Sequence, residues 1–182
     1  MVHRIHVLGA SGSGSTTLGA ELAGVLGGRH FDADNYYWKP TQPPYQVARD
    51  RVERVQMLAS DLAAEPSWTL SGSMCGWGDS LIPRFTLVVF VYLDQGTRMQ
   101  RLLARERARY GNAIEPGGEM RAHHIQFMEW AQSYDTAAPP VRGLQLHEAW
   151  LSALPCPVVR ICTDKQSGML ADDVIRAASL NR

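Results

Sequence analysis

The stretch Gly9–Thr16, with the sequence GASGSGST, most constrains how this chain can fold. A mostly apolar run, residues 5–8, precedes it, and a run of helical character, residues 18–23, follows it. Three glycines within this stretch permit a tight turn in which the backbone approaches other groups closely. A strand, a glycine turn and a helix in this order predict a βα unit of an α/β domain.

The spacing of the glycines points to a phosphate-binding loop. Gly9 and Gly14, followed by Ser15 and Thr16, match the pattern G-x-x-x-x-G-K-[ST] except that Ser15 replaces the lysine. The first N–H groups of a helix have no intrahelical partner and point at an anion beyond the helix start. We therefore predict that the backbone amides of this loop hold the phosphates of ATP and that the Thr16 hydroxyl is a Mg²⁺ ligand. The predicted nucleotide-binding residues are Gly9, Ser11, Gly12, Ser13, Gly14, Ser15 and Thr16.

The rest of the chain repeats the alternation of strands and helices. Strands are expected at residues 4–8, ending at 30–31, and at 68–70, 87–93 and 157–162. Helices are expected from residue 15, around 48–62, at 97–110, after 118, and at 143–154 and 170–180, with 36–45 as a loop. This pattern is typical of a parallel sheet. No repeat or linker divides the 182 residues, so we expect a single domain.

Two carboxylates, Asp32 and Asp34, follow the second predicted strand. Because parallel strands end at the same edge of a sheet, both are expected beside the glycine loop. Asp32 is then a candidate to hold the water shell of Mg²⁺, and Asp34 is a candidate to position the hydroxyl of an acceptor. The alternative, that this D-x-D pattern is only a solvated turn, stays open.

The glycine stretch also resembles a dinucleotide-binding turn, which is likewise followed by an acidic residue. The hydroxyl run Ser15–Thr17 counts against this alternative, because it supplies metal ligands where a dinucleotide turn favours small packing residues. A short-chain reductase would also need a Tyr-x-x-x-Lys pair. Asn35 and Ile161 stand four positions before the two lysines, so the pair is absent from the sequence.

The chain resembles the adenylate-kinase and shikimate-kinase group of P-loop kinases, and within it bacterial proteins with a hydroxyl residue in place of the loop lysine. The resemblance covers most of the chain. It rests on Gly9–Thr16, Phe31–Asp34, Leu70–Ser73 and the arginine-rich stretch after the fourth strand. It implies a three-layer fold with a five-stranded parallel sheet of order 2-3-1-4-5, and transfer of phosphate from ATP with Mg²⁺ to a nucleotide or a hydroxylated metabolite. A nucleotide-binding sensor or switch without turnover is the alternative.

The resemblance also implies where the substrates bind. An acceptor-binding segment is expected at about residues 35–65, and Asp34, Gly72 and Ser73 are the expected acceptor-binding residues. A lid over ATP is expected at about residues 98–120, with roles for some of its arginines: Arg101, Arg105, Arg107 and Arg109. The loop after the fifth strand, which includes Thr163 and Asp164, is where such kinases cover adenine.

Four arginines share one face of the helix predicted at 97–110: Arg98, Arg101, Arg105 and Arg109. A solvated basic face is one interpretation. The other is that Arg105 or Arg109 is brought in by closure of the lid and replaces the cation missing at Ser15. Arg84 precedes the fourth strand at the opposite edge of the sheet, and is expected to be structural. His124 is expected to pack inside, and the aromatic residues Tyr36, Tyr37 and Trp38 form either a pocket wall or core.

The composition narrows the choice of partners. Lysine plus arginine and aspartate plus glutamate are both 18, so the net charge does not indicate a nucleic-acid or membrane partner. Three cysteines without a C-x-x-C pair argue against a disulfide framework and a zinc site. With no signal-peptide pattern or long apolar run, we expect a cytoplasmic protein that acts on a small molecule. The sequence does not indicate its oligomeric state.

Overall fold

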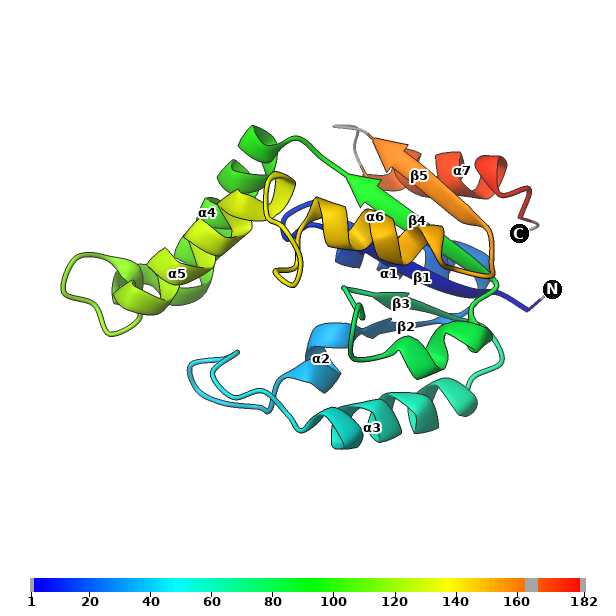
Figure 1. Cartoon of the computed structure of the whole chain (residues 1–182), viewed down its shortest axis with the longest axis horizontal. Helices are drawn as coiled ribbons and strands as arrows, with labels where there is room; N and C mark the ends of the chain where they lie inside the picture. Colours follow the sequence, from blue (N-terminus) through cyan, green and yellow to red (C-terminus); the bar gives the residue numbers. More distant parts are fainter. Residues whose placement is uncertain (1, 163–166, 181–182) are drawn as a thin grey trace.

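Five parallel strands form the centre of the molecule, and helices cover both faces of the sheet (Figure 1). The structure, a computed structural model, describes residues 2–162 and 167–180. The strands are β1 (Arg4–Gly9), β2 (Arg29–Asp32), β3 (Trp68–Ser71), β4 (Leu87–Tyr92) and β5 (Val158–Cys162). Their spatial order is β2-β3-β1-β4-β5, with every neighbouring pair parallel, which confirms the predicted sheet.

The helices follow the predicted alternation with two additions. The α-helices are α1 (Ser15–Leu26), α2 (Ala33–Tyr37), α3 (Arg51–Ala63), α4 (Gln95–Tyr110), α5 (Arg121–Gln132), α6 (Leu144–Ser152) and α7 (Ser167–Ala177), and the 3-10 turns are η1 (Asp79–Arg84), η2 (Gly111–Ile114) and η3 (Ser133–Asp135). Neither α2 nor η1 was expected. The helix α2 forms because the Asp32 carboxylate caps it and accepts the N–H of Asp34 at 3.0 Å.

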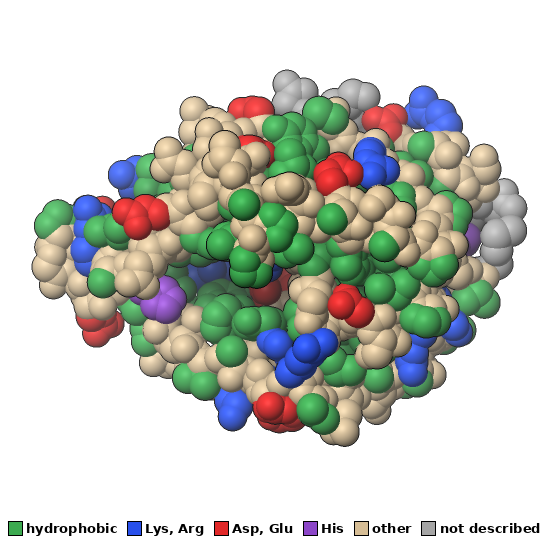
Figure 2. Space-filling view, in the orientation of Figure 1, with side chains coloured by type: hydrophobic (Ala, Val, Ile, Leu, Met, Phe, Trp, Pro, Cys, Tyr) green, Lys and Arg blue, Asp and Glu red, His purple; other side chains and the backbone are tan. Residues whose placement is uncertain are grey.

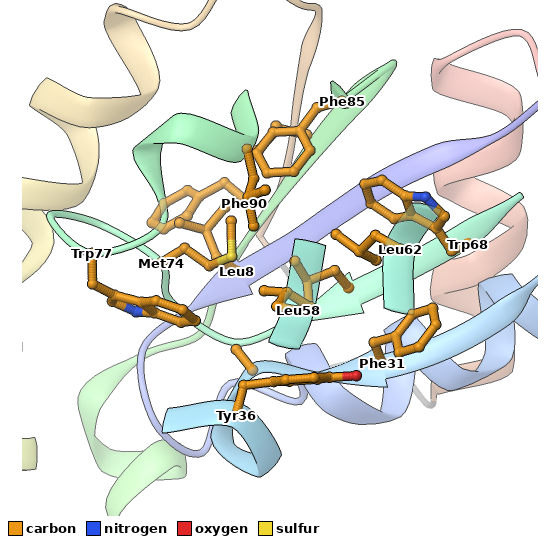
Figure 3. Close-up of a cluster of buried hydrophobic side chains, with 14 of the residues drawn as sticks. Leu8, Phe31, Tyr36, Leu58, Leu62, Trp68, Met74, Trp77, Phe85 and Phe90 are labelled. Carbon is orange, nitrogen blue, oxygen red and sulfur yellow. The ribbon is translucent and has the colours of Figure 1, made fainter. Parts of the chain in front are cut away.

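Alternate side chains of the strands pack on opposite faces of the sheet. On one face Leu8, Phe31 and Phe90 pack with residues of α3, η1 and α6 in the cluster of Figure 3. On the other face the strands pack with α1 and α7, and the buried strand residues there include Val7 and Val89. The sheet is therefore the middle of three layers, and β1, whose end carries the glycine loop, is its central strand.

The buried face of α3 differs in part from the predicted one. Leu58 and Leu62 are buried, but Val52, which the periodicity placed on the same face, is 62% exposed. The helix starts at Arg51, where the Asp50 carboxylate caps it, so Val52 lies in its first turn. There Val52 is about 120° around the helix from Leu58, at the margin of the face that packs on the core.

The helices α4 and α5 pack against each other and project from the sheet as an arm, with η2 near its tip (Figure 1). This arm contains the segment predicted as a lid. Among residues 2–162 and 167–180, no helix is both long enough and apolar enough to cross a membrane.

Candidate functional site

The glycine loop follows β1 and leads directly into α1. A Cβ on Gly9 would lie 2.3 Å from the carbonyl oxygen of Val91, and a Cβ on Gly12 would lie 2.9 Å from that of Arg98. The φ angles of Gly12 and Gly14 are +84° and +93°, which L side chains rarely adopt. The sequence uses glycine at these positions because backbone from β4 and α4 presses against the loop.

The start of α1 fits an anion such as a nucleotide phosphate. Gly14 caps the helix without any side-chain hydrogen bond, so side chains do not satisfy the first amides of α1. Ser13 is 3% exposed, and its hydroxyl has no hydrogen-bond partner among the described residues. Thr16 is exposed in the first turn. The loop thus presents backbone amides that no side-chain cap occupies and that are available to phosphate oxygens.

The D-x-D pattern lies at the same edge of the sheet as the loop. Gly72, directly after β3, joins this edge: a Cβ on it would lie 3.0 Å from the Ala33 Cβ and 3.7 Å from Asp32 Oδ1. One carboxylate oxygen of Asp32 is engaged in capping α2, which agrees with a turn role for this residue. Within the described part of the chain, no three His, Cys, Asp or Glu side chains cluster as metal ligands. A Mg²⁺ ion near Thr16 and Asp32 would therefore take most of its ligands from phosphates and water.

Asp34, which the sequence predicts to position the acceptor, lies among several charged side chains. Removal from bulk water raises the pKa of its carboxyl above its ordinary value, and the neighbouring Asp32 carboxylate raises it further. Three cations oppose this rise in pKa: Arg142, Arg105 and Arg109. The residue keeps exposed surface, so a ligand can reach it. Figure 2 shows a hollow between the arm and the body of the domain, with acidic and basic side chains inside it.

Arg142, which the sequence reasoning missed, brings a shielded cation to Asp34. It comes from the loop between η3 and α6, and its guanidinium lies 4.5 Å from the ring centre of Trp130. Burial lowers the pKa of Arg142, and the Asp34 carboxylate opposes this shift. A lone arginine between Pro140 and Gly143 was the available signal, but nothing in the sequence shows that this loop folds back to the D-x-D edge.

Arg54 of α3 is a second cation that the sequence reasoning missed. Its guanidinium lies 4.2 Å from the ring centre of Tyr37 and 4.9 Å from that of Trp77. Its Nε is buried without a hydrogen-bond partner among the described residues. Tyr36, by contrast, belongs to the core, where its hydroxyl donates to Asp61 at 2.7 Å.

Ser73 is supported by a buried chain of hydrogen bonds. Its hydroxyl lies 3.0 Å from Nε2 of His147, and Nδ1 of His147 lies 2.7 Å from the hydroxyl of Tyr134. His147 is fully buried, and this burial, with help from Arg142 and His6, lowers its pKa to about 3. The imidazole is therefore neutral and orients the Ser73 hydroxyl. The resemblance had pointed to Ser73, but the sequence reasoning missed His147 and Tyr134, which hold its hydroxyl.

The predicted arginine stripe of α4 divides into three parts. Arg98 is fully buried and paired with Asp135, so its role is structural. Arg101 places its Nη1 3.8 Å from the position of a Cβ on Gly14, at the glycine loop. Arg105 and Arg109 act on Asp34, and the Arg109 guanidinium also lies 4.7 Å from the ring centre of Tyr45. The stripe is thus not one uniform solvated face.

The tip of α4 contacts the predicted acceptor segment. Besides the Arg109–Tyr45 contact, the Tyr110 hydroxyl donates to the carbonyl of Pro44 at 3.4 Å. These contacts join the end of α4 to the segment around residues 44–45, which is far from it in sequence.

Two further residues, Arg84 and His124, have the structural roles that the sequence predicts. Arg84 donates to the Ala59 carbonyl at 2.9 Å, as expected for a structural residue. His124 is 8% exposed and lies 3.5 Å from Glu106, so it packs inside as expected. Thr163 and Asp164 lie outside the described residues.

Solved structures with the same fold include three small-molecule kinases. A shikimate kinase from Acinetobacter baumannii, in complex with shikimate, has a TM-score of 0.57 at 14% identity, over 100% of this chain and 96% of that one. A shikimate kinase from Bacteroides thetaiotaomicron has a TM-score of 0.55 at 17% identity, over 98% and 99%. A gluconokinase from Sinorhizobium meliloti 1021 has a TM-score of 0.55 at 15% identity, over 97% and 91%. The fold is therefore the P-loop NTPase fold of these kinases.

The sequence comparisons give a nearer relative. No protein-family model matches the chain. The uncharacterized protein YqaC of Bacillus subtilis (strain 168) is 43% identical over 181 residues, which cover 100% of both chains. Identity at this level over the full length shows common descent and a common fold, and the chain therefore belongs to the family of B. subtilis YqaC.

Proposed function

We propose that this protein transfers a phosphoryl group from MgATP to a small acceptor that carries a hydroxyl group and a negative charge. The observation that carries the proposal is the placement of two complementary sites at one edge of the sheet. One is the glycine loop at the start of α1, and the other is the Asp34 carboxylate with its arginines. The fold shared with shikimate kinases and a gluconokinase supports it. Such a protein would act in the cytoplasm, where ATP is available.

The loop side binds the nucleotide in this proposal. The amides from Ser11 to Thr16 hold the phosphates, and Thr16 and Asp32 serve the metal. Magnesium, when bound with ATP, neutralises charge that develops on the transferred group. The subgroup with a hydroxyl residue in place of the loop lysine, to which we assign this chain, must obtain the remaining positive charge from elsewhere.

The other side binds the acceptor. Asp34 accepts a hydrogen bond from the acceptor hydroxyl and orients it toward the loop. Arg142 and Arg54 are shielded cations, and the buried Nε of Arg54 has no described partner, which favours an acceptor with a carboxylate or phosphate group. Gly72 lets the backbone approach closely, and Ser73 offers a hydroxyl held by His147. Arg105 and Arg109, whose charges act on Asp34, stabilise the transferring charge in this proposal.

A nucleotide-binding module without turnover is the second candidate, and the serine at position 15 favours it. Phosphoryl transfer depends on positioning and charge neutralisation, so loss of a cation can abolish turnover and leave binding. Single-turnover consumption of ATP with a mixture of hydroxylated acids and nucleotides separates the two candidates. A burst of ADP that requires one acceptor supports the kinase. Tight binding without ADP formation supports the module.

Calorimetry with MgATP tests the premise that both candidate functions share, namely that the glycine loop binds MgATP. We expect a dissociation constant in the micromolar to millimolar range, which corresponds to a binding free energy on the order of −4 to −8 kcal/mol.

Substitution of the two aspartates tests their separate roles. Asp32→Asn should weaken the dependence of binding on Mg²⁺, and Asp34→Asn should impair use of the acceptor but spare ATP binding. Absence of both heat and thermal stabilisation at millimolar MgATP would refute the nucleotide site. If neither variant changes any constant, the D-x-D pattern is only a helix cap.

A further inference from the structure

The glycine loop needs a cation that its own sequence does not supply. Ser15 occupies the lysine position, and the only lysines of the chain are Lys39 and Lys165. Lys39 lies in the loop after α2, where its amide pairs with Val47, and Lys165 lies outside the described residues. The arginines that approach the loop are therefore the first candidates.

The first half of α4 is fixed directly against the loop. A Cβ on Gly12 would lie 2.9 Å from the Arg98 carbonyl oxygen and 3.0 Å from Cγ of the fully buried Leu102. Arg98 is held in turn, because its Nε donates to the Leu93 carbonyl at 2.8 Å and its guanidinium pairs with Asp135. This part of the helix consequently cannot move away from the loop without breaking buried contacts.

Arg101 extends from this fixed part of α4 to the start of α1. Its Nη1 lies 3.8 Å from the position of a Cβ on Gly14, the residue that caps α1. The side chain is exposed, and no described carboxylate forms an ion pair with it. Arg109 differs, because it lies 3.8 Å from Glu106 and stacks on Tyr45.

We propose that Arg101 supplies, from α4, the positive charge that the loop lacks at Ser15, and binds the phosphates of the nucleotide. The proposal rests on the proposed nucleotide site and adds the residue that completes it. An arginine presents several N–H donors in a plane that matches phosphate oxygens, so it can serve where lysine is absent. Arg101 stands on the part of α4 that is packed against the loop, so it is already in place when ATP binds. Arg105 and Arg109 lie farther along the arm, and their charges act on Asp34.

Calorimetry with MgATP and with adenosine tests the assignment. Arg101→Ala should weaken MgATP binding at least tenfold and leave adenosine binding unchanged, because adenosine has no phosphate. Arg101→Lys should retain most of the affinity for MgATP. Arg176→Ala is the charge-matched control: it removes an exposed arginine of α7 to which no part of the proposed site assigns a role, and it should bind MgATP like the parent. Thermal unfolding checks that each variant is folded.

The reciprocal substitution shows whether Arg101 replaces the lysine. Ser15→Lys in the Arg101→Ala background should restore at least part of the affinity for MgATP. The assignment is overturned if folded Arg101→Ala binds MgATP within twofold of the parent. It is equally overturned if Arg176→Ala loses as much affinity, or if Ser15→Lys restores none. A parent protein that binds no MgATP refutes instead the proposed nucleotide site, and this result is obtained before any substitution is made.

Discussion

The two halves of the candidate site are built by different means. The loop side is made of backbone from one continuous stretch, in which Gly9 and Gly12 have no space for a Cβ and Gly14 has a φ angle that L side chains rarely adopt. The proposed acceptor side is made of side chains from distant segments, among them Asp34 after β2, Arg54 on α3 and Arg142 before α6. A local pattern can encode the first kind of site, whereas the second exists only after the chain has folded.

This difference predicts opposite responses to mutation. Adding a single carbon to a glycine of the loop should reduce stability and MgATP binding more than removing a loop side chain does. On the acceptor side, removing a side chain should do the harm, because each polar group there depends on another for its orientation or charge.

The largest effect is expected for Gly9→Ala. Its Cβ would lie 2.3 Å from the Val91 carbonyl and 2.5 Å from Ser13 Oγ, so β1 and β4 must separate locally. We expect a loss of about 3 kcal/mol or more in the free energy of unfolding, together with loss of MgATP binding. Urea denaturation and calorimetry measure the two effects.

Gly24→Ala is the matched control for this substitution. Gly24 is exposed within α1, and nothing lies within 4 Å of its Cβ position. Alanine there should stabilise the protein by about 0.5–1 kcal/mol, because it restricts the unfolded chain and favours the helix. Equal tolerance of alanine at both positions would contradict the tightly packed loop.

The next effect is acid destabilisation through His147. Its pKa is about 3 in the folded protein and 6.5 ordinarily, so the unfolded chain binds the extra proton between these values. Its contribution is fully present above pH 6.5 and is lost as the pH falls, by about 2 kcal/mol at pH 5. Urea denaturation at pH 7 and pH 5 should show a smaller loss for His147→Gln than for the parent. The raised pKa of Asp34 acts in the opposite direction. An identical loss in parent and variant would show that His147 is not buried in neutral form.

A smaller effect is expected for Arg142→Met. This arginine lowers the pKa of Asp34, so its removal should raise that pKa further. The proposed role of Asp34 needs the carboxylate form, which holds the acceptor hydroxyl more strongly than the neutral acid and can take its proton, and the acidic limb of acceptor-dependent turnover should therefore move to higher pH. We also expect turnover to fall about tenfold, or ~1.4 kcal/mol on the barrier. An unchanged pH profile would mean that Arg142 does not face Asp34 in the working protein.

The smallest effect is expected for Ser11→Ala. Because the proposed nucleotide site holds phosphates through the loop amides, removal of this hydroxyl should change MgATP affinity by about twofold or less, or ~0.4 kcal/mol. Calorimetry on the parent and variant measures the difference. A loss of tenfold or more would show that loop side chains carry the binding, and the contrast between the two halves would then disappear.

The sequence predicted the sheet well because strand formation and the turn at the glycines depend mainly on residues that are neighbours in the sequence. Periodicity located five strands, and the resemblance supplied their order, which the structure confirms. The periodicity failed at Val52, which lies in the first turn of α3 at the margin of its buried face, where the pattern of apolar residues does not decide exposure. It also missed α2 and η1, since such short helices carry little periodicity.

The sequence by itself predicted the loop, because glycine spacing acts directly on the backbone, and it placed Asp34 at the same edge of a parallel sheet. The resemblance to P-loop kinases added Gly72 and Ser73. Only the tertiary structure decided which cations face them. The sequence does not distinguish Arg98, Arg101 and Arg105, which share one helical stripe. In the structure Arg98 is buried in an ion pair, Arg101 reaches the loop, and the charge of Arg105 acts on Asp34. The physical reason is that the place of a charge in a site depends on how whole elements pack, and residues such as Arg142 are joined to their partners only by that packing.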